Sequence, residues 1–172
     1  TTGCIVIAKS QEALVRLQVQ IQKRIASRDY LAVVHGVPAG DSGTIVGAIG
    51  RHPADRKKYA VVSDENGRYA CTHWSLQERL GDYSLLRFKL DTGRTHQIRV
   101  HCSHMNHPVV GDPTYSRCRK LPIDLPGQAL HAFQLGLDHP INRERMVFEA
   151  PMPPVMEKLL VVLRRRNASG QC

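Results

Sequence analysis

One segment near the middle of the chain joins an apolar strand pattern to a helix through a glycine turn, and it constrains the fold more than any other stretch. Residues 90–101 read Leu-Asp-Thr-Gly-Arg-Thr-His-Gln-Ile-Arg-Val-His. Gly93 allows the backbone to turn tightly, and a threonine there is placed to cap the helix that follows. A helix start is electropositive, and Arg94 and Arg99 add positive charge. The segment therefore predicts a site for an anion, either a phosphate or a buried carboxylate.

Arg99 lies between Ile98 and Val100, whose apolar side chains indicate that part of this helix is buried. A guanidinium stays charged and is costly to bury without a partner. We therefore expect a carboxylate or a phosphate opposite Arg99. For an arginine taken at random a structural ion pair is the commoner explanation, so the residues alone leave a structural and a functional role open.

Apolar patterns predict the other elements of the fold. Residues 4–8 form a short apolar run rich in β-branched residues, which is typical of a strand buried on both faces. Ser10 offers a helix cap, and apolar spacings of three and four predict a helix over residues 11–27. Further strands are predicted over residues 30–36, 44–49, 83–90, 129–137 and 146–150, and a C-terminal helix over residues 155–166. Together these elements predict an α+β fold, a mainly antiparallel mixed sheet with flanking helices.

The connections carry turn and charge signals. Asn66-Gly67 lies between the strand-like residues 59–63 and 69–77, which predicts a hairpin. Residues 113–127 predict a surface loop that contains Arg117, Arg119 and Lys120. A second loop, after the strand at 44–49, holds the best candidates for phosphate contacts outside the central segment: Arg51, Arg56, Lys57 and Lys58. The alternative is that these residues are only a solvent-exposed run of charge.

Composition sets the broad class. The 172 residues are 42% hydrophobic, which is enough for one domain with a core. We assign this domain to residues 1–166 and expect a disordered tail at residues 167–172. Lys and Arg number 24 against 15 acidic residues, a formal charge of +9. A basic domain suits a polyanion, and charge alone does not choose among RNA, DNA and an anionic membrane. No apolar run approaches the roughly 20 residues that span a bilayer.

The cysteines and histidines are candidate metal ligands and disulfide partners. The five cysteines are odd in number and irregularly spaced, which indicates reduced thiols rather than a disulfide scaffold. His101 and His104 could share a helix face with Cys102 nearby, but no second ligand pair of matching quality is present, so we expect no metal. His96 is better explained by a hydrogen bond to neighbouring backbone or by a contact to a substrate strand.

Separated stretches resemble the RluA-type RNA pseudouridine synthases. Residues 90–101, followed by Asn106-His107-Pro108 and Val110-Gly111-Asp112, closely resemble the C-terminal motif of that family. Residues 28–32, Arg-Asp-Tyr-Leu-Ala, are similar to its basic-x-Tyr-x-Ala strand, and residues 67–74 to its Gly-Lys-x-Ala-x-Thr-x-aromatic hairpin. Thr1-Thr2-Gly3 resembles the end of its Arg-Leu-Asp-x-x-Thr-[Ser/Thr]-Gly motif.

The resemblance implies isomerisation of uridine to pseudouridine in structured RNA, ribosomal or transfer, without a metal or organic cofactor. The base is flipped out, its bond to the sugar is broken, and it is rejoined through carbon. By resemblance Tyr30 packs on that base and can move a proton, although a core tyrosine would be the default for a strand, and Arg99 pairs with the catalytic aspartate. The residues expected to contact RNA are Thr92, Gly93, Arg94, His96, Arg51, Arg56, Lys57 and Lys58.

One part of the family pattern is not present. The catalytic aspartate of the family lies just upstream of Thr-Thr-Gly, and this sequence opens after it. We therefore expect part of a longer protein that is inactive by itself. A catalytically silent RNA-binding module of the same fold is the alternative, and a phosphate-handling enzyme ranks behind because a Gly-rich phosphate loop is missing. We expect a monomer in the cytoplasm or an organelle, with RNA as its partner and no membrane.

Overall fold

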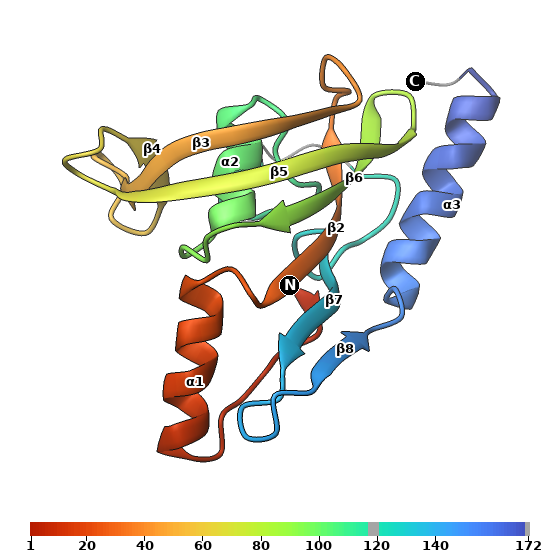
Figure 1. Ribbon diagram of the computed structural model, residues 1–172. Helices are drawn as coiled ribbons and strands as arrows, with labels where there is room; N and C mark the ends of the chain where they lie inside the picture. The colour runs from red at the N-terminus through yellow and green to blue at the C-terminus, as the bar shows by residue number, and fades with distance from the viewer. Residues whose placement is uncertain (117–120, 171–172) are drawn as a thin grey trace.

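The computed structural model describes residues 1–116 and 121–170, which form eight strands and three helices (Figure 1). The helices are α1 (Gln11–Gln22), α2 (Gln97–His104) and α3 (Pro154–Ala168). The strands are β1 (Thr2–Gly3), β2 (Ser27–His35), β3 (Ser42–Arg51), β4 (Tyr59–Val62), β5 (Arg68–Arg79), β6 (Tyr83–Leu90), β7 (Leu130–Asp138) and β8 (Arg145–Glu149).

All of these strands belong to one sheet. The strand order is β1-β7-β2-β6-β5-β3-β4, and β8 pairs with β7. Among the described strands β1 and β7 are paired in parallel, and the other pairings are antiparallel. The predicted α+β fold, a mainly antiparallel mixed sheet with flanking helices, is confirmed.

The core has a layer on each face of the sheet. Ala32 of β2 packs with Ile98 and Cys102 of α2, whereas the next residue, Val33, packs with Leu159 of α3. Successive strand residues point to opposite faces, so α2 and α3 cover opposite sides of the sheet. Figure 1 shows α3 beside the sheet and α2 across β3, β5 and β6.

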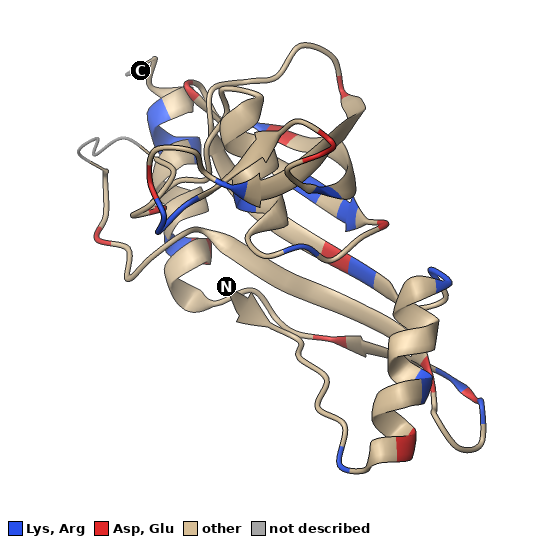
Figure 2. Ribbon diagram, turned by 90° about the vertical axis from the view of Figure 1, so that its left-hand side faces the viewer, with Lys and Arg blue, Asp and Glu red and all other residues tan. Residues whose placement is uncertain are grey.

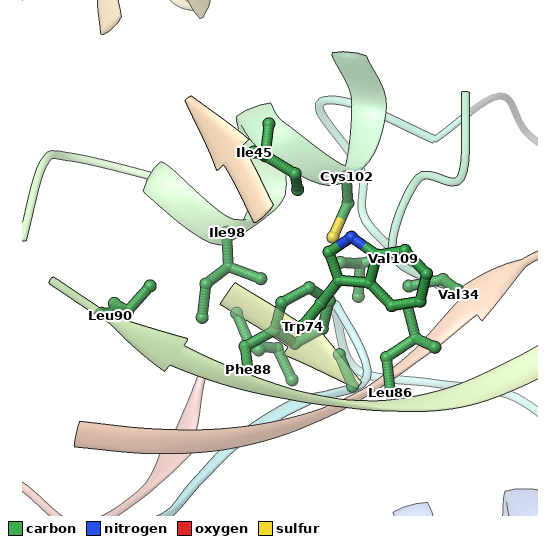
Figure 3. Close-up of a cluster of buried hydrophobic side chains, with 11 residues drawn as sticks. Val34, Ile45, Trp74, Leu86, Phe88, Leu90, Ile98, Cys102 and Val109 are labelled. Carbon is green, nitrogen blue, oxygen red and sulfur yellow. The ribbon is translucent and has the colours of Figure 1, made fainter. Parts of the chain in front are cut away.

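Aromatic residues anchor α2. Trp74 of β5 and Phe88 of β6 are cross-strand partners, with 8% and 0% of their surfaces exposed. Figure 3 shows both rings on the sheet side of the cluster, with Ile98 and Cys102 reaching toward them from the helix. This packing fixes the position of the helix that carries Arg99.

The predicted strand at residues 4–8 is wrong. Strand β1 ends at Gly3, and Ile5 and Ile7 are 82% and 76% exposed. The last sheet-like bond here is donated by the Cys4 N–H to the carbonyl of Ala132, at 2.8 Å. A β-branched run favours extended backbone, but a strand also needs a neighbour, and no described strand lies beside residues 5–7.

The predicted Asn66-Gly67 hairpin is also wrong. Strands β4 and β5 pair with opposite edges of β3, so residues 63–67 cross over the end of that strand. The crossing is close, because a Cβ on Gly50 would collide with the carbonyl oxygen of Asn66. The observed hairpin joins β3 to β4 through residues 52–58, the predicted basic loop. A turn sequence specifies a local change of direction and not the pairing partner.

Helix boundaries follow their caps only in part. Ser10 caps α1 as predicted, accepting a hydrogen bond from the Ala13 N–H, but α1 ends at Gln22 because Arg24 has a φ of 58° and β2 then begins. Helix α3 continues to Ala168, past the predicted domain end at residue 166 and into the predicted tail. Arg117, Arg119, Lys120 and the tail residues 171–172 lie outside the described residues.

The remaining predicted strands overlap observed ones. No helix among the described residues is long and apolar enough to cross a membrane. Cys4, Cys71 and Cys102 are free thiols, as expected for a chain without a disulfide scaffold. Cys118 and Cys172 lie outside the described part of the chain.

Candidate active site and RNA interface

The turn before α2 is held by a glutamine side chain and not by a threonine cap, which corrects the sequence prediction. The residue that precedes α2 is His96, with a left-handed φ of 56° and no side-chain cap bond. The Oε1 atom of Gln97 accepts hydrogen bonds from the Arg94 N–H at 2.9 Å and from the Thr92 hydroxyl at 2.8 Å. The Thr92 hydroxyl in turn accepts from the Cys71 N–H at 3.0 Å.

Gln97 also ties this turn to the sheet. Its Nε2 donates to the Cys71 carbonyl at 3.0 Å and to the Thr72 hydroxyl at 2.9 Å, and the residue is 3% exposed. A buried amide with both ends bonded fixes the backbone on either side of it. Sequence reasoning did not single out Gln97, although its place as a polar residue in the first turn of a half-buried helix was a usable signal.

Arg99 forms a two-pronged ion pair with Asp112. Its Nε lies 2.7 Å from Oδ2 and its Nη2 lies 2.8 Å from Oδ1, and the side chains are 10% and 0% exposed. Asp112 also accepts from the N–H groups of Thr114 and Tyr115. Burial raises the pKa of the Asp112 carboxyl, but these hydrogen bonds and the Arg99 charge outweigh burial and lower the pKa below its ordinary value.

The carboxylate expected opposite Arg99 is therefore within the chain. Asp112 is part of the central motif, but the sequence alone does not pair it with Arg99, because the approach of the two residues depends on the turn after α2. The geometry agrees with the structural ion pair left open at the outset. A pairing of Arg99 with an upstream aspartate stays a prediction.

Tyr30 lies on β2 beside a second arginine. It packs, partly buried, against the cluster under α2. Burial raises the pKa of the Tyr30 phenol, and the positive charge of Arg28 opposes that rise. A Cβ on Gly93 would collide with Nη1 of Arg28, so the glycine leaves room for the guanidinium in its present position. The structure thus brings a phenol, a guanidinium and the glycine turn together.

Arg28 is a functional candidate that belongs to the basic-x-Tyr stretch but was given no role from the sequence. Its Nε is buried and has no hydrogen-bond partner among the described residues. A desolvated guanidinium nitrogen favours an anionic or carbonyl partner.

Tyr30 and Arg99 face different surroundings. Ile98 belongs to the cluster that Tyr30 packs against, whereas the guanidinium of Arg99 lies 5.0 Å from the centre of the Tyr115 ring. Consecutive helix residues point about 100° apart, which accounts for this divergence. No hydrogen bond joins Tyr30 to Arg99 among the residues that the structure describes.

Some of the predicted RNA contacts gather around Tyr59. Tyr59 borders two cavities, of about 500 Å³ and about 290 Å³. Gly93 and Arg94 line the first cavity, and Lys58 lines the second. The guanidinium of Arg51 lies 4.6 Å from the centre of the Tyr59 ring. Basic groups on both sides of an aromatic ring suit a nucleic-acid strand.

Other predicted contacts are engaged inside the protein or lie apart. The Thr92 hydroxyl is used within the turn, as described above. His96 places Nδ1 3.1 Å from the Tyr115 hydroxyl and not on neighbouring backbone, and burial, followed by the Arg99 charge, lowers its pKa. Arg56 and Lys57 line neither cavity around Tyr59. Figure 2 shows that Lys and Arg are spread over helices, strands and loops.

His101 of α2 and His107, which follows that helix, bind protein groups. His101 places Nδ1 2.9 Å from the Thr72 hydroxyl, and burial lowers its pKa to about 4. His107 places Nδ1 2.8 Å from the carbonyl of His35. Among the described residues they form no three-ligand group, and the one such group consists of Cys71, His73 and Asp91.

Comparison with known proteins decides the family. Residues 1–104 match the family model described as RNA pseudouridylate synthase. The chain belongs to this family. The resemblance to RluA-type synthases is thereby confirmed, and the family is one of isomerases.

Individual relatives are similar over nearly the whole chain. An uncharacterized RNA pseudouridine synthase of Synechocystis sp. is 51% identical over 167 residues, which cover 96% of this chain and 51% of the relative. Ribosomal large subunit pseudouridine synthase D of Pseudomonas aeruginosa is 46% identical over 176 residues, covering 96% and 54%. This chain therefore spans about half the length of such relatives.

The fold is shared with a solved structure of the same family. Human RNA Pseudouridylate Synthase Domain Containing 1 superposes with a TM-score of 0.70 at 28% identity, covering 91% of this chain and 73% of the human chain. The likeness supports the sheet and helix arrangement described above.

Proposed function

We propose that the chain forms the base-holding and RNA-contacting part of an RNA pseudouridine synthase that acts on large-subunit ribosomal RNA. The family match over residues 1–104 supports this, since it includes Tyr30, Gly93 and Arg99. Relatives named ribosomal large subunit pseudouridine synthase D favour that RNA over transfer RNA. We propose that the protein acts where that RNA is found, in the cytoplasm or an organelle. It is proposed to act as a monomer that does not bind a membrane.

Tyr30 is assigned to the target base. A partly buried aromatic ring at the edge of the core can stack on a flipped uracil that has lost its neighbours. Because its pKa is raised, the phenol stays protonated at neutral pH and can donate a hydrogen bond or a proton. Arg28, with its unpartnered Nε, is assigned to a phosphate or a uracil carbonyl next to that ring.

Arg99 is assigned a fixed orientation. Asp112 accepts from Nε and from one N–H of Nη2, so a contact of Arg99 with a catalytic aspartate is left to Nη1 and the second N–H of Nη2. In the proposed reaction that aspartate assists cleavage of the bond between the uracil N1 and the ribose C1′. The base then turns, C5 forms the new bond to C1′ and loses its proton, and N1 takes up a proton, so the product is an isomer of the substrate.

The RNA backbone is assigned to the surface around Tyr59. Gly93 and Arg94 border one side of this residue, and Arg51 and Lys58 lie near its ring and its other side. Arg56 and Lys57 extend the same loop and are assigned longer-range attraction of phosphates. Thr92 holds the turn and His96 contacts the Tyr115 hydroxyl, so both are assigned the role of shaping the turn that faces the RNA.

The test measures pseudouridine by mass spectrometry in a large-subunit ribosomal RNA transcript. The 172-residue chain and the product of the complete reading frame are each assayed, with RNA affinity measured in parallel. In whichever form is active, Arg99→Lys is expected to lower turnover by about 100-fold while RNA affinity changes little. Tyr30→Phe separates ring stacking from proton donation, and Tyr83→Phe, in the α3 cluster, serves as the control.

The alternative is an RNA-binding module without catalysis. It becomes the leading function if both forms bind the transcript and neither makes pseudouridine. If Arg99→Lys abolished binding while turnover at saturating RNA survived, the assignment of Arg99 to the reaction centre would be wrong. Modification of transfer RNA but not of ribosomal RNA would overturn the proposed substrate class.

A further inference from the structure

Cys71, His73 and Asp91 converge where β5 begins and β6 ends, on the face of the sheet opposite α2. Cys71 and His73 are two residues apart on β5 and so point to the same side, and Asp91 follows β6, whose Leu90 pairs with Thr72. One ligand atom from each residue lies within 4.8 Å of the other two.

Two of the three spacings between these atoms match a tetrahedral metal site, and the third lies within 4.8 Å. The Cys71 sulfur lies 3.7 Å from Nε2 of His73, and that nitrogen lies 3.2 Å from Oδ2 of Asp91. A tetrahedral zinc ion, with Zn–S of about 2.3 Å and Zn–N and Zn–O of about 2.0–2.1 Å, separates sulfur from nitrogen by about 3.6 Å and nitrogen from oxygen by about 3.3 Å.

The imidazole is held so that Nε2 faces both partners. Its Nδ1 lies 2.9 Å from the Thr44 hydroxyl on β3, so the ring is oriented from the other side. In a nucleophile relay the carboxylate and the thiol would use different ring nitrogens. Here Asp91 and Cys71 share Nε2, which is the geometry of ligands around a common point.

The site can accept a cation with little rearrangement. Asp91 also contacts Nη1 of Arg24 at 3.1 Å, but the Arg24 side chain is 56% exposed and can move into solvent. An exposed ion pair of this kind contributes little to stability. A fourth position on the ion would be filled by water.

We propose that Cys71, His73 and Asp91 bind a Zn²⁺ ion, with Thr44 orienting the imidazole. Thiolate, imidazole and carboxylate together suit Zn²⁺, whereas Mg²⁺ and Ca²⁺ prefer oxygen ligands. Binding replaces the thiol proton with the metal and releases that proton to solvent. The ion fixes Asp91, which immediately precedes the Thr92-Gly93 turn.

The test titrates the untagged 172-residue chain with Zn²⁺ by calorimetry, and with Cd²⁺ while the ultraviolet absorption of cadmium–thiolate bonds is recorded. The expected result is one ion per chain and a thiolate band. Cys71→Ser removes the band, and Asp91→Asn weakens binding by about tenfold or more. Thr44→Val weakens binding but keeps the band, because it leaves the three ligands in place.

Controls separate this site from other thiols and imidazoles. Cys4→Ser keeps both the band and the affinity, and circular dichroism of each variant checks the fold. Unchanged Cd²⁺ absorption in Cys71→Ser, or unchanged affinity in Asp91→Asn, overturns the proposal, as does a wild-type chain without a thiolate band. If the wild-type chain shows no thiolate band, the contact between His73 and Asp91 is a hydrogen bond donated by Nε2–H and not a shared metal ion. The metal measurements do not depend on RNA activity.

Discussion

Asp112 limits what Arg99 can do. It takes two of the guanidinium nitrogens and itself accepts two backbone N–H groups, so the pair is built into the turn after α2. A buried ion pair adds little net stability over an apolar pair, but removing one partner leaves the other charged and desolvated. The pair therefore positions Arg99 strongly, whatever the reaction it serves.

Asp112→Ala is expected to lower the free energy of unfolding by about 3–5 kcal/mol, since it leaves the Arg99 guanidinium without its carboxylate. Asp41→Ala is the control, because Asp41 and Arg79 are 82% and 58% exposed, and it is expected to cost about 0–1 kcal/mol. Urea unfolding followed by circular dichroism measures both. Equal losses in the two variants would contradict the burial argument.

His101 gives the fold a pH dependence. Its pKa falls from 6.5 to about 4 on folding, because burial disfavours the charged ring. The unfolded chain therefore binds the proton first, and stability is full above pH 6.5 and falls as the pH drops toward 4. The expected loss between pH 7 and pH 5 is about 2 kcal/mol. Urea unfolding at the two pH values is expected to show a smaller loss of stability in His101→Gln than in the wild-type chain. An equal loss in both would mean that other groups cause the pH dependence.

At the scale of elements, the connection from β4 to β5 is the least local feature of the sheet. Residues 63–67 pass over the end of β3 because β4 and β5 occupy its two edges. Gly50 lies under that crossing and Gly67 ends it, packed against Ala48. This arrangement places Tyr59 and Arg68 beside the turn at Gly93 and Arg94.

Gly50→Ala is expected to destabilise the chain by about 1–3 kcal/mol, because the new Cβ meets the backbone carbonyl of Asn66 and the crossing must shift. Gly127→Ala is the matched control, since a Cβ there has nothing within 4 Å. Thermal and urea unfolding of both variants measure the difference. A hairpin between β4 and β5 would have left Gly50 free, so a neutral Gly50→Ala would argue against the crossing.

At the scale of the molecule, the formal charge of +9 favours RNA but does not localise it. Basic residues lie over many elements (Figure 2), so the surface around Tyr59 is distinguished by its cavities and its aromatic ring and not by charge alone. Salt dependence separates these possibilities, because each phosphate contact releases counterions.

Replacing Arg56, Lys57 and Lys58 with Gln is expected to reduce the slope of log affinity against log salt by about 2 for a ribosomal RNA transcript. Replacing Lys9, Arg165 and Arg166 with Gln removes the same charge away from Tyr59 and is expected to change the slope little. Filter binding across a range of KCl concentrations measures both slopes. Equal reductions would mean that binding follows net charge and not this loop.

The sequence by itself determined the α+β class, most of the strands, the Ser10 cap and the family, because these depend on local periodicity, capping chemistry and contiguous motifs. It also required a partner for Arg99, since a buried guanidinium needs one. Pairing between distant segments was decided only by the tertiary structure. Burial and sheet topology brought Asp112 to Arg99, Arg28 under Gly93, and Cys71 and His73 to Asp91. Those approaches depend on packing across the whole sheet, which no local pattern of residues specifies.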